Sequence, residues 1–236
     1  MKIKTVLFDL DGTLLPMDLD VFVKEYFKAL AANLATHGYD PKKLIDAVWA
    51  GTKDMIHNDG SKTNAQVFWD RFTAIFGKQA LEDMPLFDEF YRNHFDETKK
   101  VCGFDPAAAE AVYKIKKMGL PVVLATNPIF PPLAVEKRIT WAGLKPEDFV
   151  LYTTYENCRY SKPHPKYYAD ILAQLNLQPQ ECLMVGNDTE DDMVARQLGM
   201  QVFLLTAWLI NKSGEDISQY PHGDFQDLLR YIEDNR

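Results

Sequence analysis

Ten residues decide the fold of this chain: Val6-Leu7-Phe8-Asp9-Leu10-Asp11-Gly12-Thr13-Leu14-Leu15. A short apolar run that stops at polar residues is typical of a buried strand ending at a site. Residues two apart share one face of a strand, so Asp9 and Asp11 can reach the same side of a cavity. Asp-Gly also favours a tight turn, and taken alone the stretch fits a turn with two solvated acids equally well.

The bulk composition limits the class of protein. A chain of 236 residues with 47% hydrophobic residues suits one large domain, or a core with a smaller insert. The net charge of −8 argues against bulk binding to nucleic acid or to anionic membranes. The three scattered cysteines indicate a reducing compartment and no zinc site. With no secretory pattern and no apolar run of bilayer length, we expect a cytoplasmic monomer or homodimer.

Apolar strands alternate with amphipathic helices from residue 105 onward. This pattern predicts a parallel sheet covered on both faces, that is, a doubly wound, Rossmann-like α/β core. The strand at the start of the chain must pair with strands that come much later, so the core is expected to comprise residues 1–16 and 101–236. The predicted strands cover residues 4–10, 121–125, 149–152, 182–185 and 201–205.

The segment between these two pieces has a helical period throughout. Residues 17–100 predict four helices and no strand, which makes this segment an all-helical inserted domain. Asp18 is the expected N-cap of the first helix. The aromatic residues of these helices are expected to pack in its core.

Polar residues follow four of the five predicted strands. In open parallel sheets, ligands bind beyond the carboxyl ends of the strands, so these groups are expected to face one crevice. Several carboxylates in one crevice repel each other unless a cation lies between them. A site made only of oxygen atoms suits Mg²⁺. The residues at these ends include Asp9, Asp11, Thr126, Asn127, Asn187, Asp188, Asp191 and Asp192.

The stretch Asp9–Leu15 resembles the first motif of the haloacid dehalogenase-like hydrolase superfamily, in its phosphatase form. The resemblance implies that Asp9 is the nucleophile that forms an aspartyl-phosphate, and also a Mg²⁺ ligand. It implies that Asp11 is the general acid and base, and that its backbone carbonyl binds the metal. Gly12 is expected to contact the phosphate.

Three later segments resemble the remaining motifs of that superfamily in the expected order. Residues 122–127 resemble the second motif, in which Thr126 and Asn127 would hold phosphoryl oxygens. Residues 161–165 resemble the third, in which Lys162 would neutralise charge on the transferring phosphoryl group. Residues 185–192 resemble the fourth, with Asp188 as a direct metal ligand and Asp192 as its outer support. Asp191 is expected to be an ordinary acid of a first helical turn.

The helical insert resembles the small cap domain of the superfamily. Such a cap would close over the crevice, exclude water and select the substrate. Hinges are expected near residues 15–18 and 97–103. Within the polar stretch 51–64, Lys53, Asn58 and Lys62 are expected to meet the far end of the substrate, although a solvated loop explains them equally well.

The leading hypothesis is a Mg²⁺-dependent phosphatase that acts on a small phosphorylated metabolite. A sugar phosphomutase of the same fold would return the phosphoryl group to its substrate. A dehalogenase is disfavoured because Asp11 stands where a phosphatase acid is expected. A non-catalytic phospho-acceptor module, such as a signalling receiver, also clusters acids, Thr and Lys on a doubly wound sheet. In a receiver, the acid pair follows the first strand and the phosphorylated Asp follows a later strand. In this chain the order is Asp pair, Thr, Lys and further acids, and a helical insert is present.

Overall fold

The computed structural model describes residues 2–236, and a six-stranded sheet forms its centre. The strand order is β3-β2-β1-β4-β5-β6, and every neighbouring pair is parallel. Strand β1 therefore lies between two strands that come more than a hundred residues later in the chain. The strands are β1 (Thr5–Phe8), β2 (Val122–Leu124), β3 (Leu151–Tyr152), β4 (Cys182–Gly186), β5 (Gln201–Leu205) and β6 (His222–Gly223).

Both faces of the sheet are buried, which explains the nearly continuous apolar strands. On one face, Leu7 packs in a cluster with Met184, and this face is covered by α7 (Pro165–Gln174) and the 3₁₀ helix η5 (Met193–Leu198). On the other face, Phe8 and Val185 pack beneath the remaining core helices. These are α5 (Pro106–Lys117), α6 (Pro132–Trp141) and α8 (Phe225–Asn235). The predicted doubly wound α/β fold is confirmed.

Some elements differ from the sequence-based expectation. The helix expected to begin near Asp191 is the short 3₁₀ helix η5, which is followed by Gly199 in a left-handed conformation (φ +85°). Strand β3 has two residues instead of four, and the short strand β6 was not expected. The other 3₁₀ helices are η1 (Lys78–Leu81), η2 (Phe95–Val101), η3 (Pro146–Asp148), η4 (Pro179–Glu181) and η6 (Ile217–Gln219).

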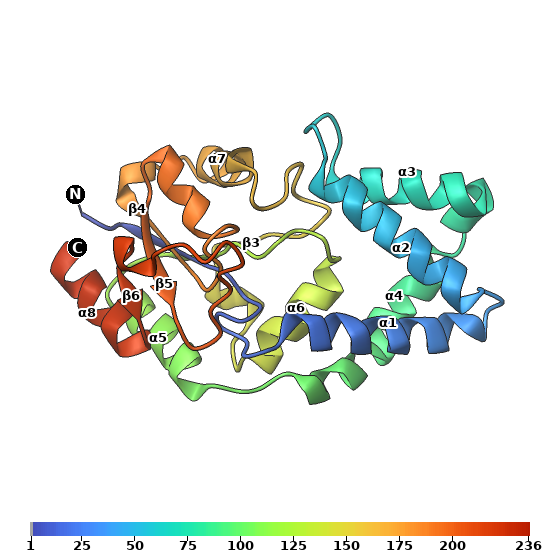
Figure 1. Ribbon diagram of the computed structural model, residues 1–236, viewed down its shortest axis with the longest axis horizontal. Helices are drawn as coiled ribbons and strands as arrows, with labels where there is room; N and C mark the ends of the chain where they lie inside the picture. Colours follow the sequence, from blue (N-terminus) through green and yellow to red (C-terminus); the bar gives the residue numbers. More distant parts are fainter. Residues whose placement is uncertain (1) are drawn as a thin grey trace.

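Four α-helices separate β1 from the rest of the core, as expected. The carboxylate of Asp18 accepts a hydrogen bond from the Val21 N–H (3.0 Å) and caps the first of them. Figure 1 shows these helices grouped at one side of the molecule, with the sheet and both chain ends at the other. They are α1 (Leu19–Ala35), α2 (Pro41–Ile56), α3 (Asn64–Phe76) and α4 (Met84–Asn93). We propose to treat residues 17–100 as the cap domain and residues 1–16 with 101–236 as the core domain.

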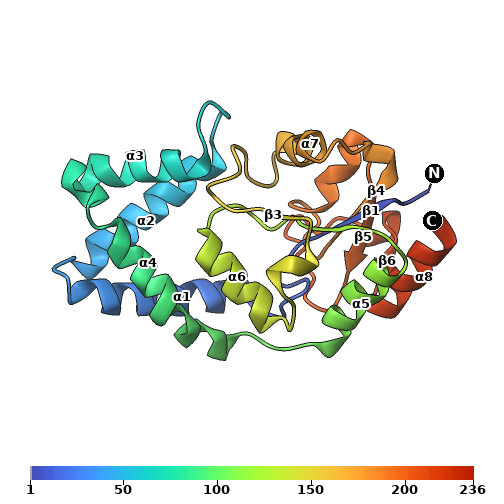
Figure 2. The same cartoon turned by 180° about the vertical axis from the view of Figure 1, so that it is seen from behind.

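The two segments that connect cap and core lie side by side. Met17 and Cys102 form an isolated antiparallel bridge, and the Gly103 N–H donates to the Pro16 carbonyl (2.7 Å). Figure 2 shows the same arrangement from behind, with the segment before α5 running back from the cap to the core. The predicted hinge regions are therefore hydrogen-bonded to each other, and hinge motion at this place remains a prediction.

Aromatic side chains pack the cap onto the core. The ring centroids of Phe95 and Trp141 are 5.1 Å apart, and those of Tyr26 and Phe130 are 5.3 Å apart. Phe130 and Trp141 belong to the segment between β2 and β3, so one hydrophobic cluster extends from the sheet into the cap. Packing of this kind fixes the position of the cap relative to the strand ends.

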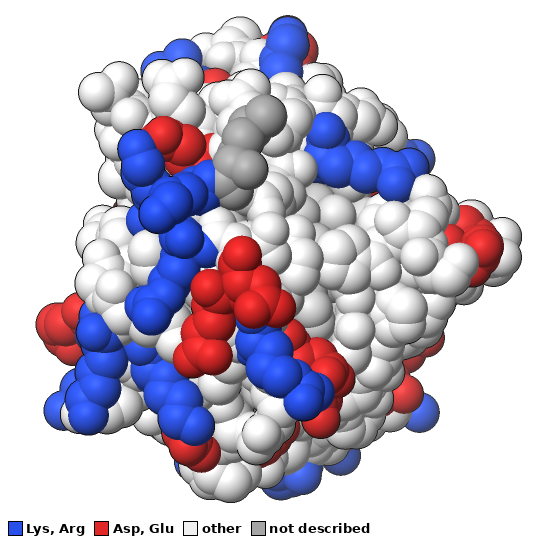
Figure 3. Space-filling model, turned by 90° about the vertical axis from the view of Figure 1, so that its left-hand side faces the viewer, with Lys and Arg blue, Asp and Glu red and all other residues white. Residues whose placement is uncertain are grey.

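The surface near the chain ends carries charges of both signs. On the face shown in Figure 3, basic and acidic side chains of the described residues lie next to one another. This face therefore presents a surface of mixed charge. Within residues 2–236, no helix is both long enough and apolar enough to cross a membrane.

Candidate active site

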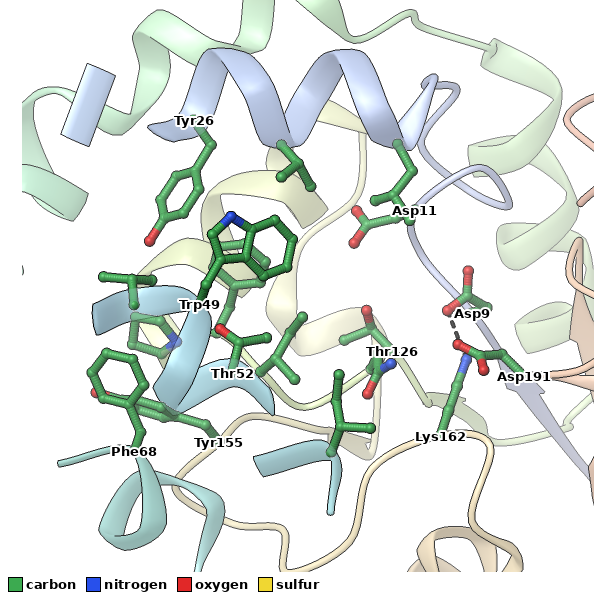
Figure 4. A pocket seen from close by; sticks show the side chains of 18 of the residues that line it. Asp9, Asp11, Tyr26, Trp49, Thr52, Phe68, Thr126, Tyr155, Lys162 and Asp191 are labelled. Atoms are coloured by element: carbon green, nitrogen blue, oxygen red, sulfur yellow. Dashed lines mark hydrogen bonds and ion pairs between the residues drawn. The ribbon is translucent and has the colours of Figure 1, made fainter. Parts of the chain in front are cut away.

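A cavity of about 460 Å³ lies where the carboxyl ends of the central strands face the cap. Its two ends differ in chemistry (Figure 4). We call the polar end the core end; it is lined by Asp9, Asp11, Thr126, Asn127, Lys162, Asp188, Asp191 and Asp192. We call the other the cap end; it is lined by Leu19, Tyr26, Trp49, Thr52, Ile56, Phe68, Met84, Phe87, Asp88, Tyr91, Tyr155 and Glu156.

Asp9 follows β1 directly, and two neighbours hold its carboxylate. Its Oδ1 accepts from Lys162 Nζ (2.7 Å), and its Oδ2 accepts from the Thr13 hydroxyl (3.0 Å). The Asp9 side chain is 10% exposed and that of Lys162 is 1% exposed. A buried carboxylate with a charged partner keeps one orientation, so Asp9 is fixed at the cavity wall.

Lys162 also links Asp9 to the loop after β4. Its Nζ donates to Asp192 Oδ1 (2.6 Å), and Asp192 Oδ2 accepts from the backbone N–H groups of Asn187 and Asp188 (3.0 Å each). Burial alone would lower the pKa of Lys162, but the carboxylates of Asp192 and Asp9 raise it well above its ordinary value. Lys162 therefore stays charged, and Asp192 shapes the loop that carries Asp188.

Gly12 and Asn187 explain why the first motif needs a glycine. Gly12 has φ +82°, and a Cβ there would lie 2.4 Å from Asn187 Nδ2. The Asn187 Oδ1 accepts from the Thr13 hydroxyl (2.9 Å), the group that also reaches Asp9. The expected phosphate contact of Gly12 stays a prediction; in this structure its N–H donates to the Leu15 carbonyl (2.8 Å). The glycine leaves room for Asn187.

Asp11 has a partner that the sequence analysis missed. The guanidinium of Arg138, on α6, forms an ion pair and a hydrogen bond with Asp11 Oδ2. Arg138 is fully buried, and its guanidinium lies 4.4 Å from the ring centroid of Phe130. The second oxygen of Asp11, Oδ1, is buried and has no hydrogen-bond partner among the described residues. Burial raises the pKa of Asp11, and Arg138 opposes that rise.

Thr126 and Asn127 follow β2 and line the core end, as expected. The Thr126 backbone carbonyl accepts from the Tyr167 hydroxyl (2.8 Å) and the Thr153 hydroxyl (2.7 Å), which fixes the backbone at this point. Asn127 Oδ1 is buried without a hydrogen-bond partner within residues 2–236. A buried polar atom of this kind costs free energy unless a ligand or water pairs with it.

Two further acids complete the core end. Asp188 Oδ1 accepts from the backbone N–H groups of Glu190 (2.7 Å) and Asp191 (3.0 Å), so its carboxylate is ordered by its own loop. Asp191 was expected to be an ordinary helix acid, but it lines the cavity near Asp9 and Lys162 (Figure 4). Burial raises the pKa of Asp191 to about 6.

The three cap residues expected to meet the substrate do not line the cavity. Lys53 is exposed on α2, and Lys62 pairs with Asp70 on the surface (2.6 Å). Asn58 is buried and donates to Asn64 Oδ1 (2.8 Å), which stabilises the loop between α2 and α3. The structure thus gives no support to a substrate contact of Lys53, Asn58 or Lys62; from the segment 51–64, Thr52 and Ile56 line the cavity.

Comparison with known proteins identifies the family. Residues 3–199 match the haloacid dehalogenase-like hydrolase family. The chain belongs to that family. The resemblance inferred from the four motifs is thus confirmed, and so is the expected enzyme class, a hydrolase.

Relatives of this haloacid dehalogenase-like hydrolase carry several names. The pyrophosphatase PpaX of Bacillus cereus is 28% identical over 197 residues, which are 84% of this chain and 80% of the relative. A predicted phosphoglycolate phosphatase from Haemophilus somnus has 22% identity and a TM-score of 0.58, over 98% of both chains. A 2-haloacid dehalogenase from Pseudomonas syringae pv. tomato has 20% identity and a TM-score of 0.60, over 97% of this chain and 99% of the other. The two structural similarities establish the fold alone.

The donor atoms of this hydrolase fit a magnesium ion. Five carboxylates line the core end against two lysines, Lys162 and Lys212. Within residues 2–236, no group of three or more Asp, Glu, His or Cys side chains is arranged to hold a metal ion by itself. Asp9, Asp188 and one backbone carbonyl would supply oxygen atoms only and leave positions for water and phosphate, which suits Mg²⁺. The buried Asp11 Oδ1 has no hydrogen-bond partner among the described residues.

Proposed function

We propose that this protein is a Mg²⁺-dependent phosphatase that hydrolyses a small phosphorylated metabolite, with Asp9 as its nucleophile. The observation that carries the proposal is the position of Asp9. Its carboxylate lies at the cavity wall at the end of β1, oriented by Lys162 (2.7 Å) and Thr13 (3.0 Å). Carboxylates in such a position form covalent aspartyl-phosphates.

The reaction has two displacements at phosphorus. An Asp9 oxygen forms a bond to phosphorus while the ester P–O bond breaks, and the leaving alcohol oxygen takes the proton of Asp11. Water then attacks the phosphorus of the aspartyl-phosphate and gives a proton back to Asp11, and the bond to Asp9 breaks to release phosphate. Burial raises the pKa of Asp11 and so favours the protonated form that the first step needs, whereas the ion pair with Arg138 opposes that rise and favours the carboxylate that the second step needs.

The other core-end residues stabilise the phosphoryl group. The Lys162 ammonium neutralises negative charge that develops during transfer. The Thr126 hydroxyl and the side-chain amide of Asn127, which both line the core end, would donate hydrogen bonds to phosphoryl oxygens. Asp9, Asp188 and the Asp11 backbone carbonyl would hold Mg²⁺, which supplies further positive charge, and Asp192 would support Asp188 through the loop.

The test is phosphate release from an aryl phosphate, with Mg²⁺ and with a chelator. We expect the wild type to release phosphate only with Mg²⁺. The Asp9→Asn variant should release no phosphate, although circular dichroism should show that it is folded. Release at the wild-type rate by Asp9→Asn would remove Asp9 as nucleophile. Isomer formation from sugar phosphates without phosphate release would favour the phosphomutase, and absence of both reactions would favour a binding module.

A further inference from the structure

The cap end of the cavity is built mainly from apolar and aromatic side chains. Tyr26, Trp49, Phe68 and Phe87 contribute rings, and they come from α1, α2, α3 and α4 respectively. Figure 4 shows Tyr26, Trp49 and Phe68 on the side of the cavity opposite Asp9 and Lys162. A substrate with its phosphate at the core end therefore places its alcohol group among these rings.

Several of these side chains are exposed although they are large and apolar. Leu19 is 44% exposed, Trp49 49%, Ile56 38% and Met84 38%, and all four line the same cavity. Apolar surface that converges on one cavity marks a binding site for an apolar group. Burying these side chains against a ligand would release the free energy that their exposure costs.

Two of the hydroxyl groups at the cap end bind each other. The hydroxyls of Tyr26 and Tyr91 form a hydrogen bond of 2.8 Å, and both residues are more than nine-tenths buried. A substrate hydroxyl at this point would have to compete with that bond. The hydroxyls of Tyr26 and Tyr91 are therefore poorly suited to bind the hydroxyl of a sugar phosphate.

Charge at the cap end disfavours a second anionic group. The fourteen cavity-lining residues from segment 17–100 include no Lys, Arg or His, and Asp88 is their one charged member. Glu156 lines the same end, and its pKa is raised by burial and by the charge of Asp88. A carboxylate or a second phosphate on the substrate would meet these two acids and be repelled.

We propose that the substrate is a phosphate monoester of a bulky apolar alcohol, aromatic or aliphatic, that carries no second anionic group. This rests on the proposed phosphatase function. The substrate class differs from the pyrophosphate and phosphoglycolate that appear in the names of the relatives. The cap end selects this alcohol by burying it against Trp49 and its neighbours. The carboxylates of Asp88 and Glu156 repel substrates that carry a second anionic group.

Binding of non-hydrolysable analogues tests the inference without requiring turnover. Isothermal titration calorimetry would measure ethyl-, butyl- and hexylphosphonate with the whole protein in Mg²⁺ buffer. We expect the dissociation constant to fall by about fourfold per added methylene while the chain enters the apolar end. Phosphonoacetate should bind more weakly than propylphosphonate of similar size. Equal dissociation constants for the three alkylphosphonates, or tighter binding of phosphonoacetate than of propylphosphonate, would overturn the inference.

Two variants and a control locate the effect. Trp49→Ala should reduce the dependence of the dissociation constant on alkyl chain length and keep the affinity for ethylphosphonate. The control is Tyr113→Ala, at an exposed aromatic outside the cavity, which should leave the dependence on chain length unchanged. Asp88→Asn should narrow the gap between phosphonoacetate and propylphosphonate. An unchanged slope in Trp49→Ala would contradict the proposed placement.

Phosphate release from the matching alkyl esters separates the two proposals. Release that rises with chain length supports both. If no ester is hydrolysed, the phosphatase proposal fails, while the calorimetric series still decides the inference about the cap end. If the short and long esters are hydrolysed equally well, the phosphatase proposal stands and the inference fails.

Discussion

The two ends of the cavity are built on opposite principles. At the core end, charged side chains are buried and hold one another, as Lys162 does between Asp9 and Asp192 (2.7 and 2.6 Å). At the cap end, large apolar side chains such as Trp49 lie exposed to an open space. The core end is held by its own ion pairs and hydrogen bonds, whereas the cap end presents apolar surface to the cavity.

This difference separates chemistry from substrate choice. Preorganised charges stabilise a phosphoryl group whatever alcohol it is attached to. An apolar surface discriminates by the shape and polarity of that alcohol. Variants at the core end should therefore change turnover for every substrate, and variants at the cap end should change the ranking of substrates. The predictions below test this separation, beginning with the largest effect.

Loss of the Asp9 nucleophile should have the largest effect. We expect Asp9→Asn to lower kcat by at least about 10³-fold for every substrate, because no other group can form the covalent intermediate. Phosphate release in steady state would measure it. Asp20→Asn, an exposed acid at the start of α1, is the control and should keep wild-type kcat. If the loss of kcat in Asp9→Asn differed from one substrate to another, the proposed separation of chemistry from substrate choice would be wrong.

The buried Arg138–Asp11 pair should dominate the stability of the core end. Arg138→Met should lower the free energy of unfolding by roughly 3 kcal/mol, since it leaves the Asp11 charge without its partner. Adding Asp11→Asn should restore part of that loss. Urea denaturation would measure both, with Arg230→Met, which breaks an exposed pair with Asp227, as the unaffected control. Equal destabilisation in the single and double variants would argue against the pair.

The close approach of Gly12 to Asn187 should appear as a difference between two glycines. Gly12 (φ +82°) and Gly38 (φ +91°) have similar backbones, but a Cβ at Gly38 has nothing within 4 Å. Gly38→Ala should cost only the left-handed strain, about 1–2 kcal/mol. Gly12→Ala should cost more and also lower kcat, because Asn187 and Thr13 must move. Equal stability of the two variants would remove the proposed contact.

The smallest effect is expected at the exposed cap lysines. Lys53→Ala and Lys62→Ala should leave kcat and KM unchanged for every substrate, because neither side chain lines the cavity. Steady-state kinetics with one aryl and one alkyl phosphate would check this. A raised KM in either variant would show that the cap end includes a cation, contrary to the proposed apolar selectivity.

The sequence predicted the core end better than the cap end. Strand–helix alternation and the polar residues at strand ends led to Asp9, Asp11, Thr126 and Asp188, and the resemblance of residues 161–165 to the third motif led to Lys162. The structure places these five residues around one cavity. Local patterns suffice there, because parallel strands bring their carboxyl ends to the same edge.

Arg138 was missed for a physical reason. It lies on the buried face of α6 at helical spacing from Ala134, but its partner Asp11 is 127 residues away. A charged residue within an apolar stripe was the available signal. The cap aromatics were expected to pack in a core, and Phe72 and Phe90 do, whereas Trp49 faces the cavity. Periodicity identifies an inward face, but it does not tell whether that face meets side chains or an open space.

The central claim is that Asp9 receives the phosphoryl group. The direct measurement is acid quenching during turnover of an aryl phosphate with Mg²⁺, followed by peptide mass spectrometry. The account predicts one phosphoryl group on Asp9 in the wild type, and a larger labelled fraction in Asp11→Asn if hydrolysis is slowed more than transfer. Rapid turnover with the label on another residue, or with Asp9 unlabelled in both proteins, would contradict the account.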